Sequence, residues 1–203
     1  MDYLAVAAIG YFLGCSSMAL YISKMKKVEL RDKGSKNLGA SNAAVLLGWS
    51  AGITVALHDI AKAVLAVVLA ELLFPDLANA GVVAGAACVL GHIFPFYLRF
   101  RGGKGFASFW GMTLALNWKL ALVIGILIVL ITLVTDYIVL ATTMTVVTVP
   151  GYYLLGIHSL IPALIILPVT LVILWKHRMN YVRIIKGEEI GLRSTAKGEK
   201  RVK

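Results

Sequence analysis

The chain has 203 residues, of which 60% are hydrophobic and only 15% are charged, and its formal net charge is +10. Soluble domains carry about 25% charged residues, so this composition excludes an ordinary soluble protein and predicts a membrane protein. The positive charge does not indicate a nucleic-acid binder, because the basic residues stand in short blocks between many long apolar runs. Anionic lipid headgroups and phosphorylated metabolites are the expected partners, and no nucleic acid is expected.

The first apolar run covers residues 3–23. It is preceded by Asp2, and no lysine or arginine comes before Lys24. A cleaved signal peptide begins with basic residues, so we expect this run to remain as a membrane span. The further apolar spans expected in chain order are 50–74, 79–98, 106–117, 119–134, 138–156 and 160–175.

The stretch from residue 106 to residue 134 fits either one long tilted helix or two short helices separated at Asn117. Charge distinguishes the two readings. With seven spans and the N-terminus outside, 18 of the 20 Lys and Arg face the cytoplasm, in the ranges 24–36, 99–104 and 176–203. A single helix would instead turn the basic C-terminal block outward. The positive-inside rule therefore predicts an all-α polytopic membrane protein with seven transmembrane helices, two short central ones, the N-terminus outside and a cytoplasmic C-terminus.

Some small residues in the spans are expected to serve packing alone. Gly10 and Gly14 lie on one helix face, as do Gly81 and Gly85, which is typical of closely packed membrane helices. The two cysteines lie inside apolar runs and are expected to be buried thiols rather than a disulfide.

Three polar segments follow directly after spans on the predicted cytoplasmic side, at residues 31–42, 91–105 and 177–189. In the second, Gly102, Gly103 and Gly105 remove side chains that would keep an anion away from backbone N–H groups. Lys104 stands among these glycines, and two arginines precede them, so cationic charge is concentrated there. We therefore predict a phosphate site at the bilayer surface, in a wet cavity built by polar segments from three helices.

The three segments contain recognisable motifs. The first is Gly34-Ser35-Lys36-Asn37-Leu38-Gly39-Ala40-Ser41-Asn42; the second has Gly91-His92, Phe94-Pro95, Phe100 and Gly102-Gly103-Lys104-Gly105; the third has His177, Arg178, Asn180, Arg183, Gly187 and Glu189. In this order they resemble the motifs of the bacterial acyl-phosphate:glycerol-3-phosphate acyltransferase family, and the resemblance covers the chain nearly end to end. Members of that family are integral membrane enzymes that start phospholipid synthesis.

The resemblance implies a reaction. An acyl chain moves from acyl phosphate to the 1-hydroxyl of glycerol-3-phosphate, giving 1-acylglycerol-3-phosphate (lysophosphatidate) and phosphate, with no cofactor and no metal. Because acyl phosphate is already activated, the enzyme must mainly hold two phosphates together, neutralise their charge and orient one hydroxyl. It also implies a multi-pass protein of the bacterial inner membrane with its active site on the cytoplasmic face.

Each motif supplies candidate site residues. We predict four catalytic residues, Ser35, Lys104, His177 and Asn180. The expected substrate-binding residues are Asn37, Gly39, Asn42, Arg101, Gly102, Gly103, Gly105, Thr142 and Arg178. Lys104 and the glycine backbone would hold phosphate, and His177 and Asn180, three residues apart, would share a helix face. His177 orients the attacking hydroxyl or takes its proton, unless the departing phosphate does so.

Several polar residues have a structural role as an alternative. Arg178, together with Arg183 and Glu189, is suited to holding the C-terminal tail in place. Asp59 and Lys62 lie one turn apart inside the second span, next to His58. Because charge inside a membrane is costly unless it is paired, we favour a structural ion pair beneath the cavity over a catalytic role.

The chain departs from the family pattern at Lys36, where a small residue is usual, and at Asp136, where arginine is common. Thr142 stands where the family has a serine. A lost cation at 136 and a gained one at 36 compensate each other if both face the cavity.

These departures leave a second function open, that of a divergent non-catalytic paralogue that binds lipid or phosphate. A third possible function is that of a small transporter, which needs inverted repeats or a polar path through the membrane. The only sequence feature that favours it is the cluster of His58, Asp59 and Lys62. We expect one transmembrane domain at residues 1–192 and a basic cytoplasmic tail at 193–203. The acyl-chain preference is open, as is the choice between a monomer and an oligomer.

Overall fold

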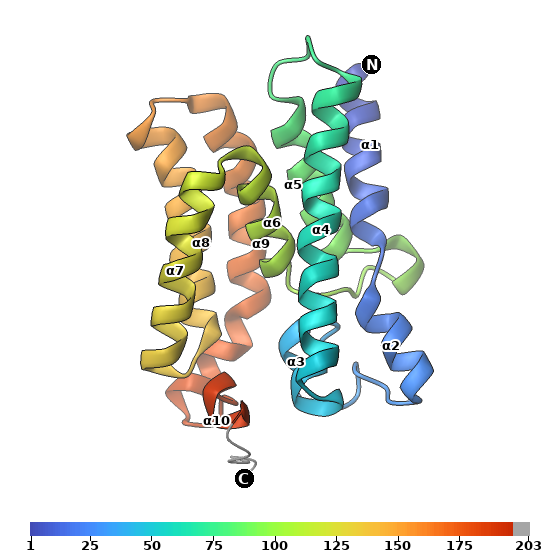
Figure 1. The fold of residues 1–203 in the computed structure, drawn as a ribbon, viewed down its shortest axis with the longest axis vertical. Coiled ribbons are helices and arrows are strands. Elements are labelled where there is room, and N and C mark those ends of the chain that lie inside the picture. The colour runs from blue at the N-terminus through green and yellow to red at the C-terminus, as the bar shows by residue number, and fades with distance from the viewer. Residues whose placement is uncertain (197–203) are drawn as a thin grey trace. The chain divides into compact units, whose positions relative to one another are not determined.

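The computed structural model describes residues 1–196, and within them every regular element is a helix (Figure 1). Six helical segments in this range are long and apolar enough to cross a membrane. They are Asp2–Lys26, Trp49–Leu73, Ala80–Leu98, Trp118–Thr135, Ile138–Gly156 and Leu160–Ile185. The expected all-α membrane architecture is confirmed. A further apolar helix, Phe106–Leu116, is shorter than these six.

The chain forms two compact units, with a boundary after Trp118. The helices up to this boundary are α1 (Asp2–Cys15), α2 (Met18–Lys26), α3 (Ala40–Leu47), α4 (Trp49–Leu73), α5 (Ala80–Ile93), the 3₁₀ turn η1 (Phe96–Leu98) and α6 (Phe106–Leu116). Those that follow are α7 (Trp118–Thr135), α8 (Ile138–Gly151), the π-helical turn η2 (Tyr152–Gly156), α9 (Leu160–Ile185) and α10 (Leu192–Ala196). The predicted tail at 193–203 begins inside α10, and its residues 197–203 lie outside the described part.

In the first unit, α1 and α5 lie in direct backbone contact. Gly10 packs on the backbone of Ala84 and Gly14 on that of Cys88, with no room for a Cβ at either glycine. The order of these contacts shows that the two helices run parallel. The packing role predicted for these glycines is therefore confirmed, as is common where membrane helices approach closely.

The first apolar run is interrupted, although the sequence predicted one span over 3–23. Helix α1 ends at Cys15, and α2 begins after Ser17, whose hydroxyl accepts a hydrogen bond from the N–H of Leu20 at 3.3 Å. Ser16 and Ser17 have extended backbone angles. A serine that caps the following helix competes with helix continuation, which explains the break.

Two helix boundaries bear on the predicted spans. The stretch 106–134 forms two helices, α6 and α7, with a break at Asn117 as predicted. Helix α9 continues past the apolar run expected at 160–175 and ends at Ile185. Its last ten residues mix polar and apolar side chains, and they include the start of the third polar segment.

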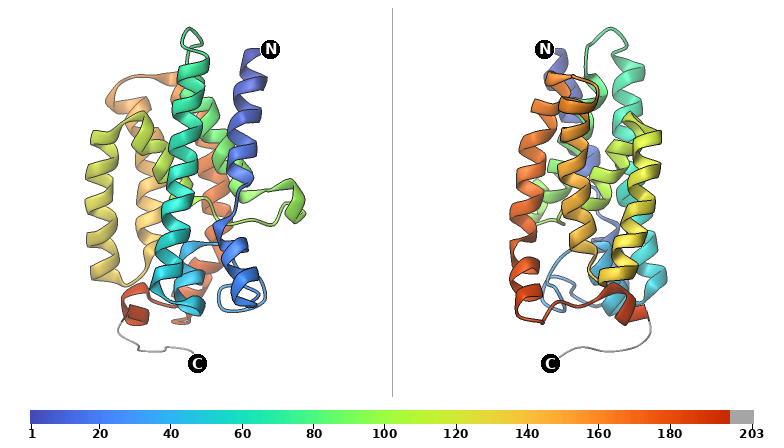
Figure 2. Two further views of the ribbon diagram at one scale, coloured as in Figure 1. Left: turned by 45° about the vertical axis from the view of Figure 1, so that its right-hand side comes forward. Right: turned by 90° about the vertical axis from the view of Figure 1, so that its left-hand side faces the viewer.

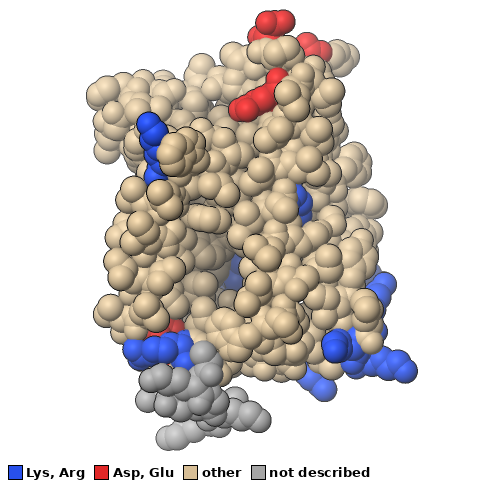
Figure 3. Space-filling view, viewed as in Figure 1, with Lys and Arg blue, Asp and Glu red and all other residues tan. Residues whose placement is uncertain are grey.

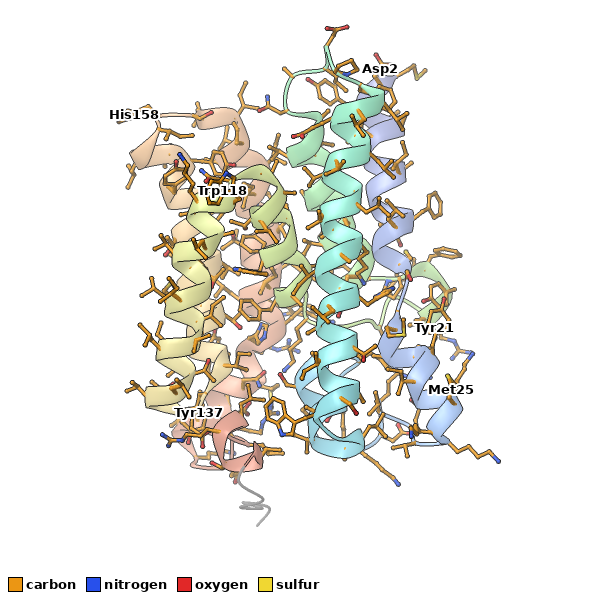
Figure 4. The ribbon with its side chains drawn as sticks, in the orientation of Figure 1. Asp2, Tyr21, Met25, Trp118, Tyr137 and His158 are labelled. Carbon is orange, nitrogen blue, oxygen red and sulfur yellow. The ribbon has the colours of Figure 1, made fainter. Side chains whose placement is uncertain are left out.

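Charge is distributed unevenly along the first unit. Three of its six acidic residues, Asp2, Glu71 and Asp76, belong to the start of α1, the end of α4 and the loop that follows it, whereas Asp59 is buried in α4 and Glu29 and Asp32 lie in the basic segment after α2. Figure 3 shows acidic side chains gathered where α1 begins, and basic side chains at the opposite end of this unit. Asp2 and Met25 mark these two ends in Figure 4; within the second unit, Tyr137 and His158 likewise mark opposite ends.

Candidate active site

The segment between α5 and α6 makes an excursion from the first unit and returns to it (Figure 2). Its outward part is a tight turn in which the N–H groups of Leu98 and Phe100 both bond to the carbonyl of Pro95, at 3.1 Å. Two tyrosine hydroxyls fasten it to α1: Tyr11 donates to the carbonyl of Phe94 at 2.8 Å, and Tyr97 to that of Cys15 at 2.7 Å. The predicted phosphate loop is thus held against a helix.

The returning part of this segment contacts the end of α5. The N–H of Gly102 bonds to the carbonyl of Ile93 at 3.0 Å, and the N–H of Gly103 to that of His92 at 3.1 Å. These two donors therefore already have partners, whereas the sequence reasoning assigned them to phosphate. A Cβ on Gly102 would collide with the carbonyl of His92. Close packing accounts for both glycines in this structure.

Gly103 also joins the first two polar segments. An ideal Cβ at Gly103 would lie 2.9 Å from the carbonyl oxygen of Leu38, on one side, and would overlap the Nε2 atom of His92 on the other. Lys104 follows and is half-buried, and Gly105, with a φ of +93°, begins α6. The structure therefore brings segments 31–42 and 91–105 together within the first unit. Arg101 is exposed.

Asn42 organises the first segment. The Nδ2 atom of this buried side chain lies 2.8, 3.2 and 3.0 Å from the carbonyl oxygens of Leu30, Lys33 and Asn37, which share its two N–H groups, and its Oδ1 atom accepts a hydrogen bond from the N–H of Ser35 at 2.9 Å. It lies in the first turn of α3, after Gly39 at the N-cap. Its amide holds the loop that presents two other predicted site residues, Ser35 and Asn37, both half-buried.

Lys36 has a local explanation. Its φ is +53°, in the left-handed region where a side chain is strained and glycine is not. A glycine at this position would avoid that strain. The Lys36 side chain is exposed.

A buried polar cluster supports the glycine loop from α4. The Nζ atom of Lys62 lies 2.8 Å from the Oδ1 atom of Asp59, 2.9 Å from Nδ1 of His92, and 2.7 Å from the carbonyl oxygen of Ser16. The ion pair predicted between Asp59 and Lys62 is confirmed. Because His92 touches Gly103, the cluster connects the break in the first span to the loop that carries Lys104. His58 takes part through its Nε2 atom, 3.0 Å from the Ser16 hydroxyl.

The third polar segment belongs to the second unit. His177 and Asn180 are both buried on α9, while the two residues between them are exposed, so they share a helix face as predicted. The Nδ1 atom of His177 lies 2.8 Å from the carbonyl of Ile173. A carbonyl only accepts hydrogen bonds, so Nδ1 carries the proton, and in the neutral ring Nε2 is the basic atom.

Glu189 orients Asn180. One carboxylate oxygen accepts a hydrogen bond from the Nδ2 group of Asn180. The other accepts a hydrogen bond from Nε of Arg183, at an N···O distance of 2.6 Å. The ion pair between Arg183 and Glu189 is consistent with the role considered for them, that of holding the C-terminal tail in place. Because the amide NH₂ faces Glu189, the Oδ1 atom of Asn180 has a fixed direction. Sequence reasoning did not assign Glu189 this task, although its place at the end of the third motif was a signal.

Two remaining predicted residues have local contacts in the second unit. The Thr142 hydroxyl donates to the carbonyl of Ile138 at 3.0 Å and is buried on α8. Arg178 is exposed; its guanidinium lies 4.4 Å from the ring centroid of Trp175 and donates to the carbonyl of the same residue. Stacking of this kind is typical of side chains at a membrane interface.

The described helices define an integral membrane protein in which the loop that carries Lys104 packs against the loop of Ser35 and Asn37. A sequence model of the family described as glycerol-3-phosphate acyltransferase matches residues 4–187. The chain therefore belongs to the glycerol-3-phosphate acyltransferase family.

Individual relatives agree over nearly the whole chain. A glycerol-3-phosphate acyltransferase 1 of Oceanobacillus iheyensis is 36% identical over 96% of this chain and 97% of its own length. A glycerol-3-phosphate acyltransferase of Coxiella burnetii is 35% identical over 93% and 97%. The crystal structure of PlsY, an integral membrane glycerol 3-phosphate acyltransferase, in its glycerol 3-phosphate form, has a TM-score of 0.90 at 26% identity and covers 98% of this chain and 100% of that one.

Proposed function

We propose that this protein transfers an acyl chain from acyl phosphate to the 1-hydroxyl of glycerol-3-phosphate. The observation that carries the proposal is the position of Gly103 between Leu38 and His92. It places the lysine loop beside the loop of Ser35 and Asn37, in a chain of the glycerol-3-phosphate acyltransferase family. Two phosphorylated substrates need such a concentration of cationic and hydrogen-bonding groups.

The bond changes are simple. The hydroxyl oxygen of glycerol-3-phosphate attacks the carbonyl carbon of acyl phosphate, an ester C–O bond forms, and the anhydride C–O bond breaks to release phosphate. Lys104 supplies positive charge for substrate phosphate, and Ser35 and Asn37 supply hydrogen bonds to phosphate or glycerol oxygens. Gly102 and Gly103 act by letting the loop pack, since their N–H groups bond to α5.

His177 and Asn180 complete the proposed catalytic set. With its proton on Nδ1, His177 presents Nε2 as the atom that orients the attacking hydroxyl or accepts its proton. Asn180, fixed by Glu189, presents Oδ1 as a hydrogen-bond acceptor. Asn42 positions the first loop through its amide, and Gly39 is the N-cap residue of α3. Thr142 and Arg178 stay predicted substrate contacts.

The membrane topology is part of the proposal. Seven crossings, with α6 as a short fourth one and the N-terminus outside, place 18 of the 20 Lys and Arg on the cytoplasmic side of a bacterial cell membrane. The separation of acidic and basic ends in the first unit supports this direction (Figure 3). Single cysteines introduced at Asp76 and at Lys33 test it: a membrane-impermeant thiol reagent added to intact cells should label the first and not the second.

The activity itself is tested with purified protein in detergent. Acyl phosphate and glycerol-3-phosphate together should release phosphate and form lysophosphatidate, and omitting either should stop ester formation. Lys104→Ala and His177→Ala should each lower kcat/KM at least 100-fold. Binding of glycerol-3-phosphate without any product would instead identify a non-catalytic paralogue and defeat the proposal. Complementation of a bacterium lacking this acyltransferase gives the same test in cells.

A further inference from the structure

The turn between α7 and α8 receives the C-terminal end of the described chain. Asp136 lies at this turn. Its Oδ1 atom accepts hydrogen bonds from the backbone N–H of Arg193, at 2.6 Å, and from that of Ser194, at 3.1 Å. Its Oδ2 atom accepts a hydrogen bond from the hydroxyl of Ser194. The backbone carbonyl of Asp136 accepts the N–H of Leu192 at 2.9 Å. One carboxylate thus holds the start of α10 through side-chain and backbone bonds.

Two further contacts fasten the same segment. The guanidinium of Arg193 donates to the carbonyl of Leu133 at 2.7 Å, near the end of α7. Gly191 packs so closely on the Asp136 carboxylate that a Cβ would overlap it. The segment Gly191–Ala196 and Asp136 are called the C-terminal clasp below. The contacts described here lie within the second unit.

The clasp is two residues away from the group that orients Asn180. Helix α9 ends at Ile185, and Gly187, with a φ of +68°, reverses the chain. Glu189 then bridges Asn180 and Arg183, and Gly191 enters the clasp. The chain around Glu189 is therefore held on one side by α9 and on the other by the α7–α8 turn.

Such a double attachment has a physical consequence. A glutamate on a loose tail must lose backbone and side-chain freedom each time it contacts Asn180, whereas a docked tail keeps it at high effective concentration. An orienting contact of this kind matters to catalysis because small misplacements of a reacting group lower the rate strongly.

We propose that Asp136 is a positioning residue: through the C-terminal clasp it keeps Glu189 against Asn180. This inference rests on the proposed function, in which Asn180 takes part in the reaction.

The first test removes the acceptor. Asp136→Ala should lower kcat roughly tenfold with little change in the KM for glycerol-3-phosphate, because orientation and not binding is lost. Asp136→Asn keeps one acceptor oxygen, so it should recover kcat to within about threefold of wild type. Glu188→Ala, which removes an exposed carboxylate from the segment that carries Glu189, is the matched control and should leave kcat unchanged.

A second measurement reads the clasp without activity. Trypsin cleaves after Arg193, whose peptide bond joins the two residues that Asp136 holds. Asp136→Ala should accelerate this cleavage at least tenfold, and Glu188→Ala should not. Equal cleavage in wild type and Asp136→Ala would show that no clasp forms. Faster cleavage with unchanged kcat would show a clasp with no positioning role.

A double-mutant cycle tests the route through Glu189. In a Glu189→Ala background, or Glu189→Gln if that variant does not fold, Asp136→Ala should lower kcat by less than twofold. A full tenfold loss in that background would overturn the inference, because the clasp would then act elsewhere. If the wild-type protein shows no turnover, both the proposed function and the positioning role of Asp136 are wrong. The rate of trypsin cleavage still shows in that case whether the clasp exists.

Discussion

His92 and Gly103 are in direct contact, and the Nε2 atom of His92 lies where a Cβ on Gly103 would be. Gly103→Ala must therefore move either the imidazole or the loop that carries Lys104. We expect kcat/KM for glycerol-3-phosphate to fall at least tenfold, measured by phosphate release. Gly151→Ala is the matched control, since a Cβ at Gly151 on α8 meets nothing within 4 Å. Equal activity of the two variants would contradict a positioning role for this contact.

The pair of Asp59 and Lys62 is expected to behave as a buried ion pair. Lys62→Met leaves the Asp59 carboxylate buried without its cation, which should lower the free energy of unfolding by about 3–5 kcal/mol. Adding Asp59→Asn removes that unpaired charge, so the double variant should be more stable than Lys62→Met alone. Thermal unfolding in detergent measures both. Additive destabilisation would argue against a coupled pair.

Lys36 is expected to carry backbone strain. Its φ of +53° costs a side-chain-bearing residue about 1 kcal/mol, which Lys36→Gly removes, although glycine gives back part of this gain through the entropy of the unfolded chain. The unfolding temperature should therefore rise slightly or stay level, with activity retained. Lys36→Val should lower it, because a β-branched residue tolerates this conformation least. A clear loss of stability in Lys36→Gly would count against the explanation.

Acid is expected to open the C-terminal clasp. Burial raises the pKa of the Asp136 carboxyl, but hydrogen bonds from the hydroxyl and N–H of Ser194 and the N–H of Arg193 outweigh it, so the pKa lies below its usual value. The folded form therefore gains stability above the ordinary Asp pKa of about 3.9, and this gain is lost as the pH falls through the lower, folded value.

Hydrogen exchange at the amide of Ser194 measures this effect. After correction for the intrinsic pH dependence, protection should be constant from pH 7 to pH 5 and should fall below about pH 4. Asp136→Asn, which does not titrate, should show a flat profile. A wild-type profile that is equally flat would contradict the assignment of Asp136 as the acceptor.

The helical architecture was accessible from the sequence where apolar length and polar interruptions decide it. Asn117 separates α6 from α7 as expected, because three polar or interfacial residues interrupt an apolar stretch. The break at Ser16 and Ser17 was not predicted, since two serines are apolar enough to continue a span, and only their capping geometry ends the helix. The exact end of α9 at Ile185 lies beyond the last apolar run, where mixed polar and apolar residues give no clear hydropathy signal.

The site was accessible at the level of segments and less so at the level of atoms. Segments 31–42 and 91–105 meet at Gly103, and His177 and Asn180 share a face of α9. The partners of the Gly102 and Gly103 N–H groups depend on how the chain returns to α5, which a motif does not encode. The same holds for Asn42, whose four hydrogen bonds require loop geometry.

The return of the loop to α5 also has an electrostatic effect. The last carbonyls of a helix carry a partial negative charge equivalent to about half an elementary charge, which repels anions. Gly102 and Gly103 cover two such carbonyls, those of Ile93 and His92, with their own N–H groups. The residue that follows is Lys104. The loop therefore pairs two of the exposed carbonyls at the end of α5 directly before Lys104, which weakens the field that would oppose an anion in the proposed phosphate site.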